Sequence, residues 1–130
     1  MSDVFEAFSK VLHWPKAAVK DYQEWYDQAR AADEEEGSPD EPRVTWECYT
    51  QGDKMHLVSE DFFDAEKLAG SIRTILEKYD LPPVGISWSR ETSWGEERGG
   101  GALWVRAHGD YSLFDTFTWL KQMALEDGHE

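Results

Sequence analysis

The sequence is short of cysteine, of long apolar runs and of basic residues. Its 130 residues include one cysteine, Cys48, which excludes a disulfide within the chain. The sequence has no apolar run of the ~18 residues that a membrane helix needs and no charged-then-apolar signal segment, so we expect a cytoplasmic protein without a membrane partner. There are 13 Lys and Arg against 27 Asp and Glu, a net charge of −14. Because phosphate contacts need Lys and Arg, direct binding of nucleic acid is not expected.

What the chain has in abundance is apolar and aromatic side chains. Apolar residues make up 40% of the sequence and aromatic residues 14%, including seven tryptophans. This content is too high for a disordered polyelectrolyte, and the length suits one ordinary folded domain. We therefore expect a folded acidic protein.

The first third of the chain predicts a helical arm followed by a linker. Val4, Phe5, Phe8, Val11 and Leu12 are spaced like the apolar stripe of a short amphipathic helix. Pro15 suits the first position of a second helix, running to about residue 32. Residues 33–42 hold six acids, two prolines and no apolar residue, which indicates an exposed acidic linker. The predicted organisation is an arm over residues 1–32, this linker, and a domain over 43–130.

The remaining residues alternate between strand and helix patterns. Strands are predicted from Val44 and from Met55, joined by a turn at residues 51–54, and again from Val84 and from Leu103. Residues 95–101 are predicted to be a flexible connection. Helices are predicted after a cap at Asp61 or Asp64 and from Ser112. This ββαββα order predicts an α+β fold: a four-stranded, mainly antiparallel sheet with two helices on one face, preceded by the N-terminal helical arm.

No motif predicts an enzyme, a metal site or a cofactor. His56 with Glu60 and His108 with Asp110, even with Cys48 added, have the wrong spacing for structural zinc, and we expect no metal ligands and no cofactor. The segment Gly85-Ile86-Ser87-Trp88-Ser89 lacks the closing glycine of a nucleophile elbow. A small enzyme or ligand-binding module on the open sheet face, using His56 or His108 as acid or base, remains a third hypothesis.

Negative charge is densest in the first third of the chain. Residues 1–42 carry a net charge of −7, as do the 88 residues that follow. On a helix, acids three apart repeat at about 4.5 Å, close to the ~3.4 Å between phosphates of one DNA strand. These carboxylates therefore form a candidate surface for a basic partner, with DNA mimicry as its sharpest form. The candidate partner-binding acids are Asp21, Glu24, Asp27, Asp33, Glu34, Glu35, Glu36, Asp40 and Glu41.

Two of the tryptophans break the pattern of the predicted core. Trp46 and Trp88 share the apolar phase of their strands, whereas Trp104 has the opposite phase from Leu103, and Trp94 lies at a loop edge. The two outliers either pack under the N-terminal helices or serve as aromatic anchors for a partner. We include Trp94 and Trp104 among the candidate partner-binding residues.

The stretch from about Phe62 to Leu120 resembles small uncharacterised acidic proteins of bacteriophages. The resemblance rests on Gly85-Ile86-Ser87-Trp88-Ser89, on Gly99-Gly100-Gly101 and on Thr118-Trp119-Leu120. It implies an inhibitor of host defence or of host nucleic-acid machinery, acting in the host cytoplasm, and some such proteins imitate DNA. It brings no catalytic residues.

The sequence thus predicts a small acidic binding protein, with a basic, nucleic-acid-binding host protein as partner and inhibition as outcome. Acids would speed the encounter and exposed aromatics would slow dissociation. The alternative is a structural or assembly protein that forms a homodimer or larger oligomer through its N-terminal helices, with Phe5, Phe8, Val11 and Leu12 at the contact.

Overall fold

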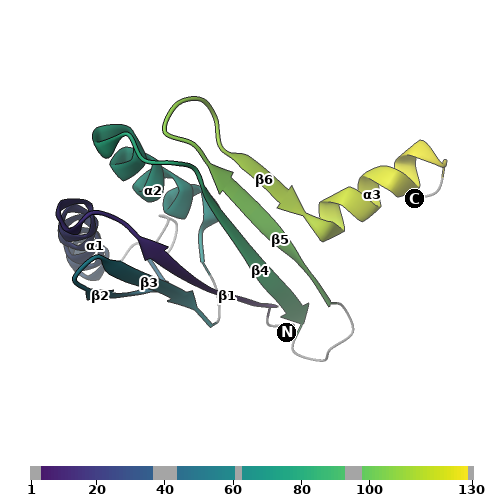
Figure 1. The fold of residues 1–130 in the computed structure, drawn as a ribbon. Coiled ribbons are helices and arrows are strands. Elements are labelled where there is room, and N and C mark those ends of the chain that lie inside the picture. The colour runs from purple at the N-terminus through teal and green to yellow at the C-terminus, as the bar shows by residue number, and fades with distance from the viewer. Residues whose placement is uncertain (1–3, 37–43, 61–62, 93–97, 129–130) are drawn as a thin grey trace.

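The computed structural model describes residues 4–36, 44–60, 63–92 and 98–128. In these ranges six strands and three helices alternate along the chain (Figure 1). In order they are β1 (Val4–His13), α1 (Lys16–Glu36), β2 (Glu47–Gln51), β3 (Lys54–Ser59), α2 (Ala65–Tyr79), β4 (Val84–Thr92), β5 (Arg98–Val105), β6 (Ser112–Asp115) and α3 (Thr116–Glu126).

The strands form one antiparallel sheet in the order β2-β3-β1-β4-β5-β6. The prediction of a four-stranded sheet with an N-terminal helical arm is therefore wrong, although the α+β class is confirmed. The elements from β1 to β4 have the βαββαβ order, and their strands lie in the order 2-3-1-4, which is the ferredoxin-like arrangement. Strands β5 and β6 extend this sheet beyond β4.

Residues 4–12, predicted as a helix, form β1 in the middle of the sheet. The strand pairs with β3 on one side and with β4 on the other. Phe8 and Leu12 are buried toward the helices, whereas Val11 is 48% exposed on the opposite face. A central strand can carry apolar residues on both faces, and the resulting adjacent pairs imitate a helical stripe.

The middle of the chain has the predicted order of elements, although β2 begins at Glu47 and not at Val44. Strands β2 and β3 form a hairpin whose turn contains Gly52 at φ +63°. Helix α2 begins after Asp64, whose carboxylate accepts a hydrogen bond from the Lys67 amide at 2.9 Å. The helix ends at Asp80, which adopts the left-handed conformation at φ 51°. Local turn and cap signals sufficed here because no distant contact opposes them.

The C-terminal part differs from the prediction in two places. Residues 98–101, predicted as a flexible connection, belong to β5, and Ser112–Asp115, predicted as the start of a helix, forms strand β6. Gly101 pairs with Trp88 of β4, and a Cβ atom on Gly101 would lie 2.6 Å from Trp88 Cε2 and 2.5 Å from the Phe114 carbonyl oxygen. The glycine run therefore lets the Trp88 indole lie against the neighbouring strand, and it does not serve as a turn.

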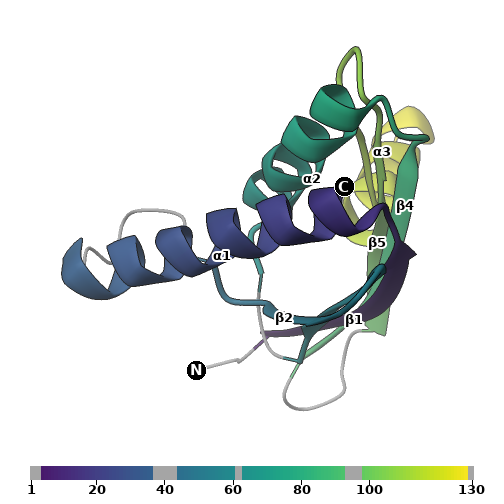
Figure 2. The same cartoon turned by 60° about the vertical axis from the view of Figure 1, so that its left-hand side comes forward.

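Helices α1 and α2 cover one face of the sheet (Figure 2), so α1 is no separate arm. The buried Tyr22 hydroxyl lies 3.0 Å from Ser71 Oγ of α2, and it accepts a hydrogen bond from Trp46 Nε1 at 3.2 Å. Tyr26 donates to the Trp46 carbonyl oxygen at 2.6 Å. Because these buried polar groups satisfy one another, α1 is held in one position on the sheet.

Trp46 and Trp88 lie in the core, as predicted, with 0% and 8% of their surface exposed. The core also holds Met55 and Leu57 of β3 and the apolar side of α2. No helix in the described ranges is both long and apolar enough to cross a membrane.

Candidate functional site

Asp21, the first of the predicted partner-binding acids, is bound within the molecule. Its carboxylate lies 2.6 Å from Lys78 Nζ and accepts a hydrogen bond from the Tyr79 hydroxyl at 2.5 Å, both on α2. The hydrogen bond from Lys78 is the main cause, and that from Tyr79 the next, of a pKa of Asp21 below its usual range. Asp21 therefore holds α1 against α2 and is not free to face a partner.

Asp33 also has an internal role, whereas two other acids of α1 are exposed. The Asp33 carboxylate accepts a hydrogen bond from the Val44 amide at 2.7 Å, which joins the end of α1 to the segment before β2. Glu24 and Asp27 lie on the exposed surface of α1. Asp27 accepts a hydrogen bond from Gln23 Nε2 at 2.9 Å.

The other predicted acids are only partly described. Helix α1 continues through Glu34, Glu35 and Glu36, so this part of the predicted linker is helical. Asp40, Glu41 and Trp94 lie outside the described residues. The four acids of α1 whose side chains are described therefore divide into two internal ones and two exposed ones, which do not form one uninterrupted row.

The sheet face away from α1 and α2 carries small side chains in its middle and exposed aromatic side chains toward its ends. Pairing places small residues in its middle rows, such as Ala7 beside Ser89 and Ser87 beside Ala102. Toward the ends of the sheet the same face carries Tyr49 and Trp104, which are 59% and 45% exposed. We call this surface the open face.

Trp104 lies on the open face, opposite in phase to the buried Leu103 and Val105. It pairs with Gly85, and a Cβ atom on Gly85 would lie 3.1 Å from Trp104 Cε3, so the indole covers the glycine. With Phe114, which is 47% exposed, Trp104 helps to line a groove of about 370 Å³. The aromatic side chain predicted as an anchor is thus exposed beside a second aromatic.

Exposed apolar side chains gather at the C-terminal end of the chain. Of the eight large hydrophobic residues exposed in the described ranges, six lie between residues 104 and 125. We call these six the C-terminal apolar surface: Trp104, Leu113, Phe114, Trp119, Leu120 and Leu125. They lie on different sides of this region: Trp104 and Phe114 are on the open face, Leu113 pairs with the buried Leu103 on the other face, and the rest are on α3. Helix α3 extends from the far end of the sheet (Figure 1), and none of its described residues belongs to the buried core.

The beginning of α3 is nevertheless firmly attached. Asp115 caps the helix by accepting a hydrogen bond from the Thr118 amide at 3.0 Å, and its other oxygen lies 3.4 Å from Arg90 of β4. Thr116 Oγ1 accepts a hydrogen bond from the Gly100 amide at 2.9 Å. The cap fixes where α3 starts, while packing does little to hold its later turns.

The segment that carries these six residues has no net charge. Residues 104–125 contain two acids and two bases, whereas the whole chain carries −14. Exposed acids follow directly at Glu126 and Asp127, so a partner that covers the C-terminal apolar surface has few charges to desolvate only within residues 104–125.

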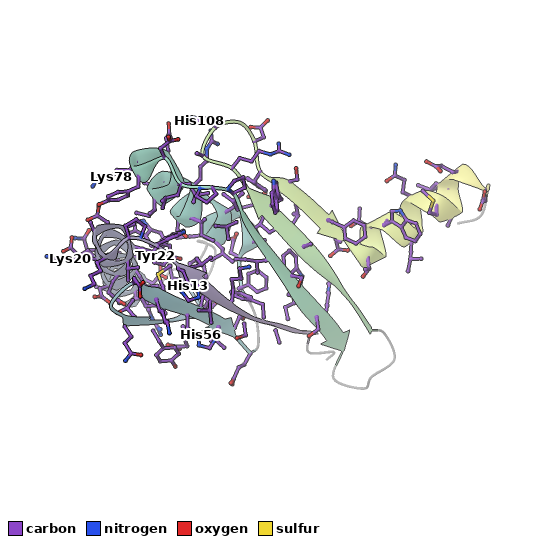
Figure 3. The ribbon with its side chains drawn as sticks, in the orientation of Figure 1. His13, Lys20, Tyr22, His56, Lys78 and His108 are labelled. Carbon is purple, nitrogen blue, oxygen red and sulfur yellow. The ribbon has the colours of Figure 1, made fainter. Side chains whose placement is uncertain are left out.

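The two histidines considered as acid or base lie far apart (Figure 3). His56 is half-buried on β3, where its Nε2 atom lies 2.6 Å from Ser9 Oγ of β1. His108 is exposed after the end of β5. In the part of the chain that the structure describes, no group of three or more His, Cys, Asp or Glu side chains could hold a metal ion.

Cys48 is a poor nucleophile in this position. Its thiol lies 3.7 Å from Gln23 Oε1, between β2 and α1. Burial is the main cause that raises the pKa of the Cys48 thiol to about 12, and the Asp27 carboxylate adds to the effect. At neutral pH the group is a thiol, whereas nucleophilic attack needs the thiolate.

Sequence reasoning missed most of the C-terminal apolar surface. Leu113 and Leu120 fit a helical stripe, which normally indicates a buried side. Leu113 lies in strand β6 and not in the helix, and on α3 the same period arises whether or not another element covers the helix, so no local signal marks these residues as exposed. The exposure of Trp104 could be predicted because successive residues of a strand point to opposite faces of the sheet.

Comparisons of the chain with protein-family models, with curated proteins and with solved structures found no match.

Proposed function

We propose that this protein is a binding protein that attaches to a basic protein partner, with a nucleic-acid-binding host protein as the expected kind, and inhibits it. The observation that carries the proposal is the C-terminal apolar surface, since most of the exposed large apolar side chains of the described residues lie in this part of the chain, and exposed apolar side chains that gather mark interaction sites. Trp104 and Trp119 are the expected anchors, because tryptophan is enriched among residues that dominate binding energy.

The charge of the protein and its apolar surface would have separate roles. A net charge of −14 attracts a basic partner over a distance and raises the association rate. Residues 104–125 carry no net charge, so the contact itself would bury few unpaired ions. Salt should therefore slow association, whereas loss of an apolar anchor should speed dissociation.

The proposal is tested by capture of partners from a lysate of the cells in which the protein acts, at low and at high salt. Trp119→Ser with Leu120→Ser should release the captured basic protein, because both side chains are about half exposed and their loss leaves the core intact. The matched control is Val11→Ser with Tyr49→Ser, which removes two exposed apolar side chains from the other end of the open face.

Acid variants test the electrostatic part. Reversal of Glu24 and Asp27 to lysine should weaken capture, while Asp21 and Asp33 are left unchanged because they hold the fold together. Capture that is insensitive to salt and to these reversals would refute the role of charge. Light scattering on the purified protein adds one further outcome: a dimer abolished by the α3 variants would mean that a second copy covers the surface, and it would refute the proposed partner.

A further inference from the structure

A second feature of the open face lies at its other end, where three strands place matching side chains in rows. Pairing aligns Tyr49 of β2, His56 of β3 and Val11 of β1 in one row. The next row holds Gln51, Lys54 and His13. Directly paired side chains share a face, so both rows line one corner of the sheet.

His56 is held in place within this corner. Its Nε2 atom lies 2.6 Å from Ser9 Oγ, and its ring centre lies 6.4 Å from that of Tyr49, with the planes inclined at 46°. The contact with Ser9 occupies one ring nitrogen and leaves Nδ1 for another partner. His56 and Tyr49 together form a preset aromatic wall.

The contact between Ser9 and His56 resembles a nucleophile with its base, but its surroundings do not suit catalysis. Strand β3 is paired on both sides, and residues 8–13 of β1 pair with β3, so the backbone amides between these strands are engaged in the sheet. A hydrolase needs free donors where negative charge develops on the substrate. The pair therefore orients His56, which makes a binding role the better interpretation.

The corner forms a pocket of about 330 Å³ lined by Val11, Tyr49, Thr50, Gln51, Lys54 and His56. Its polar lining is rich in hydrogen-bond donors, with an ammonium, an amide and hydroxyl groups, and none of the lining residues is an acid. The chain as a whole is acidic, with 27 Asp and Glu, whereas the charged residue that lines this pocket is the cation Lys54. Two acids lie near in sequence: Glu47 is paired with Arg30 at 3.2 Å, and Asp53 belongs to the turn.

We propose that this pocket binds a small planar aromatic anion. The ring of the ligand would lie against Tyr49 and His56, with Val11 as an apolar contact, and its carboxylate or phosphate group would face Lys54. The volume is at the lower end of the range for small-molecule sites, which favours a ligand of about the size of a mononucleotide. This inference is independent of the proposed protein partner, because it uses the opposite end of the open face.

The test is a titration of the full chain with adenosine monophosphate and with salicylate, followed by backbone amide chemical shifts in NMR spectra. Two control ligands separate the aromatic ring from the anionic group. Adenosine has the ring without the anion, and inorganic phosphate has the anion without the ring. We expect shifts around Tyr49 and His56 with both aromatic anions. Binding should be about fivefold weaker for Lys54→Gln and for Tyr49→Ala, as loss of one exposed charge or one stacking contact implies.

Arg106→Gln is the matched control, because it removes one exposed positive charge outside the pocket. It should leave the affinity unchanged. Equal weakening by Arg106→Gln, equal affinity for inorganic phosphate alone, or no shift in the pocket at millimolar ligand would each overturn the proposal. If only one aromatic anion binds, the site is confirmed and its preference for carboxylate or phosphate is defined. Thermal unfolding of each variant checks that the fold is kept.

Discussion

Gly101 offers the sharpest test of how the C-terminal half of the sheet is packed. In Gly101→Ala the new Cβ atom would lie 2.5 Å from the Phe114 carbonyl oxygen and 2.6 Å from Trp88 Cε2. Trp88 can turn only at the expense of its contact with Phe63, whose ring centre lies 5.1 Å away. The carbonyl belongs to the backbone of β6, so that strand must move as well.

Overpacking of a core costs about 1–3 kcal/mol, and a backbone clash places this site near ~3 kcal/mol. Alanine also lowers the conformational entropy of the unfolded chain, and this offsets up to about 1 kcal/mol of the lost stability. The free energy of unfolding should therefore fall by about 2 kcal/mol. For a urea dependence of about 2 kcal/mol/M, the midpoint of unfolding should fall by about 1 M.

Gly70→Ala is the matched control, since it adds the same methyl group in the middle of α2. Apart from its chain neighbours and the nearby backbone of α2, no heavy atom lies within 4 Å of a Cβ placed there. Alanine is the better helix former, so this variant should gain about 0.5–1 kcal/mol. Urea unfolding followed by tryptophan fluorescence and by circular dichroism measures both variants. A Gly101→Ala protein as stable as the wild type would refute the close packing of Trp88 on β5.

Three further outcomes follow from the buried and paired polar groups. Tyr22→Phe should lower the free energy of unfolding by about 1–3 kcal/mol, because Trp46 Nε1 loses its acceptor; an unchanged urea midpoint would contradict this. Cys48 should react with a thiol reagent near pH 8 at least about 100-fold more slowly in the native protein than in urea, since its pKa is raised to about 12; equal rates would contradict its burial. The pKa of Asp21 is lowered in the folded state, so the contribution of its pair with Lys78 is present above the unfolded pKa and is lost as the pH falls through the folded one. Asp21→Asn should accordingly reduce the urea midpoint at neutral pH, and its difference from the wild type should shrink as the pH falls below the unfolded pKa of about 3.9.

The elements that the sequence predicts correctly are those with local signals. The hairpin at Gly52, the helix capped by Asp64 and the helix after Pro15 each depend on residues close in the chain. The predictions are wrong where contacts with distant segments of the chain determine the secondary structure. Strand β1 exists because β3 and β4 flank it, and residues 98–101 are extended because Trp88 packs across them.

The candidate site shows the same division. Alternation along one strand is enough to place Trp104 on the open face, whereas exposure of Trp119 depends on the absence of a covering element among the described ones. The internal roles of Asp21 and Asp33 could not be predicted either. Each depends on a residue of another segment, Lys78 for the first and Val44 for the second.

The central position of β1 also affects how the protein can fold during its synthesis. β1 precedes both of its neighbours, and its partners are residues 54–59 of β3 and 89–92 of β4. On the ribosome, residues 8–13 of β1 must wait for β3, and residues 4–7 must wait for the later part of β4. The apolar residues of β1 therefore stay unpaired while the intervening segments are made, and the nascent chain is the form most exposed to aggregation and to chaperones.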